Sequence, residues 1–416
     1  MEHLGIDQHI TEFTNACDDA INVYRQGNEL KQIVLEAPEG EISATTMNVL
    51  NQAIEGLVER SGVSYSTLAM ESASTRTELK TVSVEGLGNF IREVWGKIKE
   101  AFLALVKRIK EFFTGNERKA EQIKEDIQDA KEEMKDVEKE AVKKDVEGKE
   151  LEVVIENPSP YILHKSYFKG NQKEVTVKFH DLVDNFANYC MKSREHHLLE
   201  WVRDFKEDML AILDKVDPKA SNPNVINEVY SVLHNYVSEK KITADQVTGT
   251  RKFKGMETVE EFDSDYGNKR YVIKFGVEKE EGKNSSEALY TEQIIARAHR
   301  ANEIVKITYT GVEVMDMKHL ANALTDNYTE LTNYIKISKE LNALNMAVVD
   351  MIRDIENGAG EDLDPTHVVT LGVINKGINA ISKLFGVMQS DVMAVMTEHT
   401  KLYTLFTEKF KAELLS

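Results

Sequence analysis

The clearest group of residues that could bind a metal ion by type and spacing is Glu195-His196-His197-Leu-Leu-Glu200. On a helix, His196 and Glu200 lie four residues apart on one face and could reach the same ion. A zinc protease, however, needs two His on one face with a Glu between them as the base. The order here is different, and no third ligand is indicated. We therefore interpret this segment as an exposed helical face and predict no metal site.

A second candidate is the loop Gly276-Val-Glu-Lys-Glu-Glu-Gly282-Lys-Asn284, which is superficially similar to a phosphate-binding loop. Five residues separate its glycines instead of four, and Asn284 stands where a Ser or Thr hydroxyl would hold magnesium. The three Glu of the loop would also repel phosphate. The pattern therefore predicts a hairpin turn and no nucleotide cofactor.

The two cysteines, Cys17 and Cys190, are too few for a disulfide framework or a four-thiolate zinc site. Cys190 with His180 or His196 would make a thiol–imidazole pair, but the apolar helical surroundings of Cys190 are typical of a buried structural thiol. A Gly-x-Ser-x-Gly elbow is also missing from the sequence. We predict no catalytic residues, no cofactor and no enzymatic activity.

Composition indicates that the elements carrying these residues are mainly helical and acidic. The chain has 416 residues, with 71 Asp and Glu against 52 Lys and Arg, for a net charge of −19. Such a charge is poorly suited to neutralising a phosphate backbone. Residues 39–157 and 224–364 contain no proline, which leaves room for long helices. No apolar run reaches the roughly 18 residues of a membrane span, and no secretory signal is recognisable.

Hydrophobic periodicity predicts a mainly α fold, with long helices and helical hairpins and a small β-containing insertion in the middle. Within the insertion we expect a helix at 286–301. The predicted regions are a helical segment ending in a Ser/Thr-rich exposed linker (1–85), an amphipathic helix plus a charged coiled-coil-like helix (86–146), a mixed α/β middle (147–312) and a long C-terminal helical hairpin (313–416).

The helix expected at 87–113 has the strongest physical signature. Its apolar side chains recur every three or four residues; they are Leu87, Ile91, Val94, Trp95, Ile98, Phe102, Leu105, Ile109 and Phe112. Residues 86–115 carry six Lys and Arg against three Glu, a net charge of +3. Cations opposite an apolar face are typical of an interfacial membrane helix. They are also typical of a core helix that pairs with the acidic helix that follows, which is the interpretation we favour, or of a helix that binds a protein or nucleic acid.

A break is expected at Thr114-Gly115-Asn116, followed by a second helix with a heptad seam. The seam residues are Ala120, Ile123, Ile127, Ala130, Met134, Val137 and Ala141, with charged residues almost everywhere else. This pattern favours a coiled coil or hairpin arm, or a charged helix resting on a core. In the C-terminal region, Asp364-Pro365 supplies an N-cap and a first-turn proline between two apolar stripes, which predicts a helical hairpin.

The junction Ser83-Val84-Glu85-Gly86, followed by GNFIREVWGKIKEAFLALVKRIKEFF, resembles the internal head (inner capsid) proteins of large contractile-tailed bacteriophages. In that family a small residue, any residue and then Glu mark cleavage by the phage prohead protease. The resemblance implies that residues 1–85 are a propeptide. Cleavage would fall between Glu85 and Gly86, with Ser83 as the recognised small residue, and the bond between Glu71 and Ser72 fits the same pattern as an alternative.

The resemblance also implies a location and a set of partners. The protein would be a virion structural protein inside the phage head, and would be in the host cytoplasm before assembly. Its partners would be the prohead protease, the capsid inner surface or other internal virion proteins, packaged DNA through local basic patches, and a second copy of the chain. The competing hypothesis is a membrane-active or host-interacting helical protein that uses the helix at 87–113.

Overall fold

The fold is described from a computed structural model. The residues that the structure describes are scattered positions between 22 and 59 and the segments 76–146, 148–168, 172–195, 198–217, 228, 232, 247–250, 258–263, 265–267, 269–275, 277–278, 289–290, 293–298, 304–359 and 365–415.

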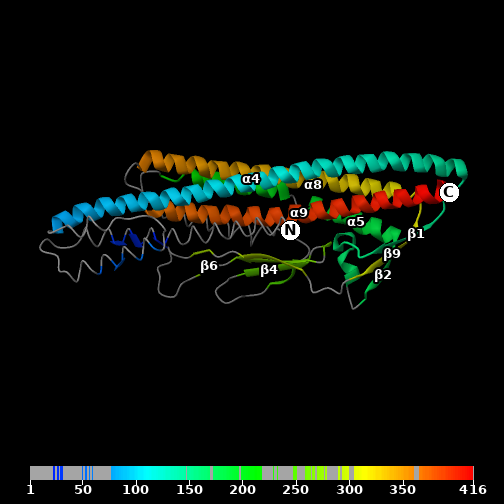
Figure 1. Ribbon diagram of the computed structural model, residues 1–416, viewed down its shortest axis with the longest axis horizontal. Helices are drawn as coiled ribbons and strands as arrows, with labels where there is room; N and C mark the ends of the chain where they lie inside the picture. The colour runs from blue at the N-terminus through cyan, green and yellow to red at the C-terminus, as the bar shows by residue number, and fades with distance from the viewer. Residues whose placement is uncertain are drawn as a thin grey trace. The chain divides into compact units, whose positions relative to one another are not determined.

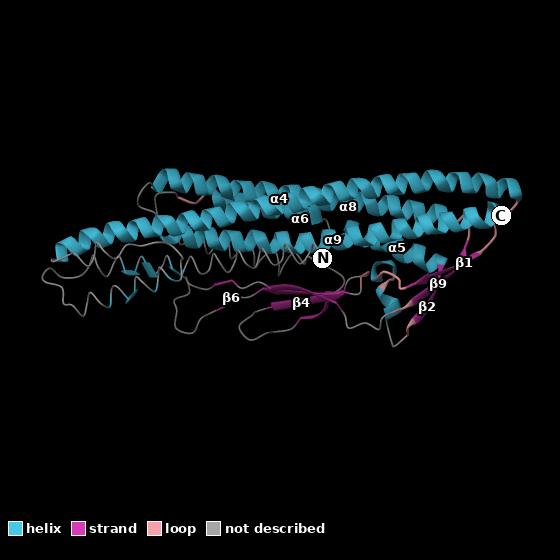
Figure 2. Cartoon of the chain, in the orientation of Figure 1, coloured by secondary structure: helices cyan, strands magenta, loops and turns pink. Residues whose placement is uncertain are grey.

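Helices dominate the described part of the chain (Figure 2). They are α4 (Arg76–Lys144), α5 (Phe179–Glu195), α6 (Leu198–Leu213), α8 (Met317–Ala359) and α9 (Pro365–Leu415), with the short 3-10 helices η1 (Pro160–Ile162) and η2 (Lys165–Phe168). The strands all fall in the middle of the sequence. The prediction of a mainly α fold with a small β-containing middle is therefore confirmed.

The chain forms two compact units, each built from three separate stretches. Unit 1 comprises residues 1–110, 207–233 and 342–379, and unit 2 comprises residues 111–206, 234–341 and 380–416. Helices α4, α6, α8 and α9 each contribute residues to both units. The domain ranges expected from the sequence divide the chain differently and stay a prediction.

Helix α4 is continuous where the sequence predicts a break at 114–116, so that prediction is wrong. Gly115 in a helix interior costs about 1 kcal/mol relative to Ala. The buried face nevertheless runs straight through the glycine, because Phe113, Asn116 and Ala120 are 7%, 4% and 0% exposed. Burial of this face outweighs the weak local propensity.

In unit 2, α4 and α8 lie antiparallel. Lys339 Nζ of α8 lies 3.0 Å from a carboxylate oxygen of Glu117, and Lys131 Nζ of α4 donates to Thr325 Oγ1 over 2.9 Å. From Glu117 to Lys131 of α4, the contact residue on α8 moves back by the same number of residues, from Lys339 to Thr325.

Helix α9 lies parallel to α4 in unit 2. Phe112 is near Gly386, and further along both helices Glu133 pairs with Lys411 at 2.8 Å. The seam predicted on α4 is buried at all its positions, which are Ala120, Ile123, Ile127, Ala130, Met134, Val137 and Ala141. The charged remainder of this stretch faces outward or packs at the rim.

In unit 1, the two apolar stripes predicted for the C-terminal region lie on α8 and α9. Leu344, Val348, Ile374 and Ile378 are each 0% exposed. Helix α9 begins at Pro365 as predicted. The segment that follows α6 contacts the start of α9, where the His367 Nε2 atom lies 2.9 Å from the Asp217 carbonyl oxygen.

In unit 2, α9 is covered on all sides over the stretch from Gln389 to Met393. Five successive residues from Gln389 to Met393 are buried, which requires neighbours all round the helix. Away from α4 and α8 these neighbours include α5 and the small sheet. The ring of Phe406 packs edge-on against Phe179 and Tyr309, with both centroids 5.5 Å away.

A three-stranded sheet of order β1-β9-β2 closes the middle insertion. Strand β1 (Leu151–Glu156) follows α4 and pairs antiparallel with β9 (Lys306–Val312), which precedes α8; β2 (Glu174–Lys178) pairs parallel with β9. These strands lie beside α5 and the end of α9 (Figure 1). The chain between β1 and β9 is therefore an insertion whose two ends are held together by strand pairing.

Within the insertion, a second antiparallel sheet has the order β3 (Val247–Thr250), β4 (Thr258–Asp263), β5 (Lys269–Phe275) and β8 (Gln293–Ala298), and β6 (Val277–Glu278) pairs with β7 (Leu289–Tyr290). The helix predicted at 286–301 is wrong. Ile294 and Ile295 pair with Ile273 and Val272 of β5, and such β-branched pairs favour a sheet.

We expect Phe406→Ala to lower the free energy of unfolding by about 3–5 kcal/mol, because Phe406 is fully buried between α5 and the sheet. Equilibrium urea unfolding measures this change. The matched control is Val142→Ala, because this side chain is 61% exposed; it should change stability by less than about 0.5 kcal/mol. Equal effects of the two substitutions would contradict the packing described here.

Candidate functional site

The predicted processing junction lies inside α4. The backbone is helical from Arg76 onward, so the bond between Glu85 and Gly86 is part of the helix. Residues 76–85 are thus helical where the sequence predicts an irregular linker. The alternative cut between Glu71 and Ser72 lies outside the described residues.

The helix is intrinsically weak on both sides of this bond. Gly86 and Gly88 each cost about 1 kcal/mol relative to Ala in a helix interior, and Ser83 and Val84 are also poor helix formers. Two of the four glycines of α4 therefore lie within three residues of the bond. A protease binds an extended segment, so local unwinding must come before cleavage. Because the helix propensity of these residues is low, unwinding the helix costs little free energy at this point.

The apolar face predicted for 87–113 is largely buried within the chain. Val94, Trp95, Ile98, Phe102, Leu105 and Ile109 are all at most 4% exposed. Phe112 is half-buried, and the side chains of Leu87 and Ile91 are outside the description. These buried side chains contribute to the core, so the face is not open to a membrane or partner in this fold. Their role as an interaction helix stays a prediction.

One carboxylate fixes α4 against α8 in unit 1. The indole Nε1–H of Trp95 donates to Glu356 Oε1 over 3.3 Å, and Lys99 Nζ lies 2.8 and 2.7 Å from the two carboxylate oxygens. Lys99 and Glu356 are 36% and 30% exposed, so the ion pair contributes less than about 1 kcal/mol. Its main effect is to set the position of α4 along α8.

The outward face of this part of α4 carries the cations. Its exposed basic residues are Arg92, Lys97, Lys107, Arg108 and Lys110, and its exposed acidic residues are Glu93, Glu100 and Glu111. The face is therefore a basic patch with interspersed carboxylates, opposite the buried apolar stripe.

Most of the candidates for metal or thiol chemistry lie outside what the structure describes. His196 and His197 lie outside the described residues, as does the side chain of Cys190. His180 is exposed and contacts Asp184 at 3.0 Å on the same helix. Within the segments that the structure describes, no group of three or more His, Cys, Asp or Glu is placed to hold a metal ion. The described helices also include none that is long and apolar enough to cross a membrane.

The structure instead shows a buried anchor that the sequence did not indicate, in the turn between β4 and β5. The Asp265 carboxylate is 6% exposed and forms an ion pair with Lys165, whose Nζ lies 2.8 Å from Asp265 Oδ1. The main chain is tied as well, because Lys165 N–H donates to the Asp265 carbonyl over 2.7 Å and Gly267 N–H donates to the Pro160 carbonyl over 3.1 Å. This turn therefore docks the second sheet onto η1 and η2.

Tyr266, between these two residues, inserts into an aromatic box. It is 1% exposed and lies edge-on to Tyr189 of α5 and His399 of α9, with ring centroids 5.3 and 5.1 Å away. His399 in turn stacks on Phe186 at 4.0 Å with an interplanar angle of 5°. Burial lowers the pKa of His399 from 6.5 to about 4, so the ring is neutral near pH 7.

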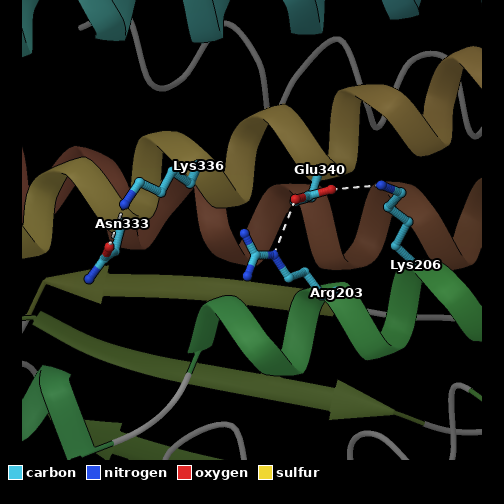
Figure 3. Close-up of polar contacts among 5 residues, drawn as sticks. All are labelled: Arg203, Lys206, Asn333, Lys336 and Glu340. Carbon is cyan, nitrogen blue, oxygen red and sulfur yellow. Dashed lines mark hydrogen bonds and ion pairs between the residues drawn. The ribbon is translucent and has the colours of Figure 1, made fainter.

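A second polar connection ties α6 to α8 in unit 2 (Figure 3). Glu340 of α8 lies between two cations of α6, with Lys206 Nζ at 2.7 Å and Arg203 Nε at 3.3 Å. One turn away on α8, Lys336 contacts Asn333. The hydrogen bond from Lys206, followed by that from Arg203, holds the pKa of Glu340 below its ordinary value.

The sequence offers only a weak signal for the Tyr266 anchor. Turn residues surround Tyr266 in Ser-Asp-Tyr-Gly-Asn, and Gly267 adopts a φ of +81° there. This turn signal does not identify His399 or Lys165 as partners, because these residues are far away in the chain.

Comparison with known proteins yields one match. The model of the family described as phiKZ-like phage internal head proteins matches residues 7–403. No match was found among curated proteins or among solved structures.

The neutral buried His399 predicts a pH dependence of stability. Its pKa is depressed in the folded state, so between about pH 6.5 and 4 the unfolded chain binds more protons than the folded chain. Its contribution, on the order of 3 kcal/mol, is therefore fully present above pH 6.5 and is lost as the pH falls to about 4. Urea unfolding across this range should show that loss. It should shrink in His399→Phe and persist in His319→Gln, which alters an exposed histidine. Equal slopes in His399→Phe and the wild type would contradict the assignment.

We expect Gly267→Ala to destabilise the protein more than Gly311→Ala. Both glycines have positive φ, +81° and +67°, so both substitutions carry backbone strain. A Cβ at Gly267 would also lie 2.5 Å from Cε1 of Tyr161, whereas nothing lies within 4 Å of one at Gly311. Thermal or urea unfolding of both variants measures the difference, and equal losses would show that the close approach to Tyr161 is absent.

Proposed function

The chain belongs to the phiKZ-like phage internal head proteins, and from this premise we propose that it is a virion structural protein, packaged inside the phage head and matured there by the prohead protease. The family match over 7–403 supports the location. The motif Ser83-Val84-Glu85 at a glycine-weakened point of α4 supports the processing. On this proposal the protein contacts the capsid inner surface or other internal proteins. The basic outward face of α4 would be its contact with packaged DNA.

The fold itself would limit which small-x-Glu motifs the protease can cut. Other small-x-Glu motifs occur in the described part, and several are shielded by packing. Asn116, Ala130, Val312 and Ser338, one from each of four such motifs, are at most 4% exposed. Three of these motifs also lie inside helices that pack in unit 2. A cut after Glu85 would not require any of this core to open.

Cleavage would also change the residue at which α4 begins. A new α-ammonium group at Gly86 is unfavourable at a helix N-terminus, because the helix dipole is positive there. Asn89 is exposed and is a good N-cap residue, so the helix can restart at that point. Residues 86–88 would then leave the helix and become a short free arm.

The membrane-active alternative finds no support in the packing. The face that would enter a membrane is the one whose residues from Val94 to Ile109 are buried in unit 1. Exposing it would remove α4 from the core, at a cost of roughly 1.5–3 kcal/mol for each large apolar side chain.

In purified virions, mass spectrometry with N-terminal mapping should find peptides that begin at Gly86 or Ser72 and few from residues 1–71. Glu85→Gln removes the residue at the cut and should abolish the Gly86 terminus. Glu78→Gln is the matched control, because Glu78 is also in α4 but follows no small residue at the required spacing; it should be processed normally. Full-length chain in mature wild-type particles would contradict the processing.

A further inference from the structure

One small-x-Glu motif differs from the shielded ones. Among the motifs whose three side chains are all described, Gly148-Lys149-Glu150 alone is exposed at every position and lies outside helices and strands. It forms the connection between α4 and β1 in unit 2. Exposed irregular backbone is where proteolytic nicking concentrates.

The described residues of the connection are held by backbone hydrogen bonds and one exposed ion pair. Helix α4 ends at Lys144, and Asp145 takes a left-handed φ of 56°. Lys149 N–H donates to the Val146 carbonyl over 3.1 Å. Lys149 Nζ lies 3.3 Å from Glu413 Oε2, and these side chains are 43% and 45% exposed, so the ion pair contributes little.

The residues after Glu150 already have the conformation that proteases bind. β1 is extended and lies at an edge of its sheet, paired with β9. Many binding clefts take a peptide as an added strand, which such an edge permits. The register shifts between Leu151 and Val153, which weakens the ladder at the first pair. Leu151 is 3% exposed, so seating the bond needs this one side chain to leave the core.

We propose that the bond between Glu150 and Leu151 is a second processing site of the same protease. The proposal rests on the proposed function, which supplies that protease. Water adds across the amide, the C–N bond between the Glu150 carbonyl carbon and the Leu151 nitrogen breaks, and the products are a Glu150 carboxylate and a Leu151 ammonium group.

The cut would leave the two pieces associated. Residues 111–144 stay packed through the buried seam of α4. Two polar contacts also link them to the rest of unit 2, Lys131 to Thr325 and Glu133 to Lys411. Leu151 would pair with Val312 once β1 returns to its place in the sheet. The mature protein is then a non-covalent assembly of residues 86–150 and 151–416.

N-terminal mapping of purified virions tests this directly. A peptide that begins at Leu151, found together with the Gly86 terminus, is the expected result. A Gly86 terminus with only uncut peptides across 150–151 would overturn this inference and leave the proposed function intact. Full-length chain in the particles would overturn both.

Two further measurements distinguish the exposure of the bond after Glu150 from recognition of the small-x-Glu motif by the protease. Glu150→Gln should remove the Leu151 terminus and keep the Gly86 terminus, whereas Glu152→Gln, an exposed residue of β1 outside the motif, should keep both. Limited digestion of the purified full chain with a Glu-specific endoprotease should cut after Glu150 before it cuts after Glu117, Glu132 or Glu340. Simultaneous cutting at these four positions would contradict the proposed exposure.

Discussion

The structure of unit 2 depends on the burial of α9 on all its sides between Gln389 and Met393. Water is excluded from this stretch, so a hydrogen bond from a neighbouring element stabilises each buried polar side chain that receives one. Gln389 Oε1 accepts a hydrogen bond from Ser338 of α8 over 3.0 Å, and Asp391 Oδ1 accepts one from the Tyr161 hydroxyl of η1 over 3.3 Å. His399 Nδ1 lies 2.9 Å from the carbonyl oxygen of Val395 on its own helix. These contacts define both the register of α8 on α9 and the face of α9 that the insertion covers.

On the proposed function, this constraint would let the chain be processed while the helical core of unit 2 stays intact. The side chains that hold α4, such as Met134 and Val137, are buried against other helices. A protease that acts on the exposed connection to β1 would remove a covalent link without removing a packing surface of unit 2. A cut after Glu85 would also remove part of unit 1, which includes the buried Val23. The core motifs would stay uncut, because the same packing covers Asn116 and Ser338.

Local periodicity predicted much of this fold. The seam of α4, the apolar stripe from Val94 to Ile109 and the start of α9 at Pro365 follow from spacings within a few turns. The errors arose where long-range packing decided the outcome. Gly115 stays helical because the buried face continues across it, and Ile294 is in a strand because β5 pairs with it. The Asp265-Tyr266-Gly267 anchor and the contact of Trp95 with Glu356 join residues distant in sequence, so no local pattern could identify them.

The most direct test of the account is the intact mass of this protein from purified particles, measured under native and then denaturing conditions. The account predicts a species without residues 1–85 that stays assembled under native conditions. After denaturation it should separate into pieces if the α4–β1 connection has also been cut. The undivided 47.2-kDa chain with its leader attached would contradict the account.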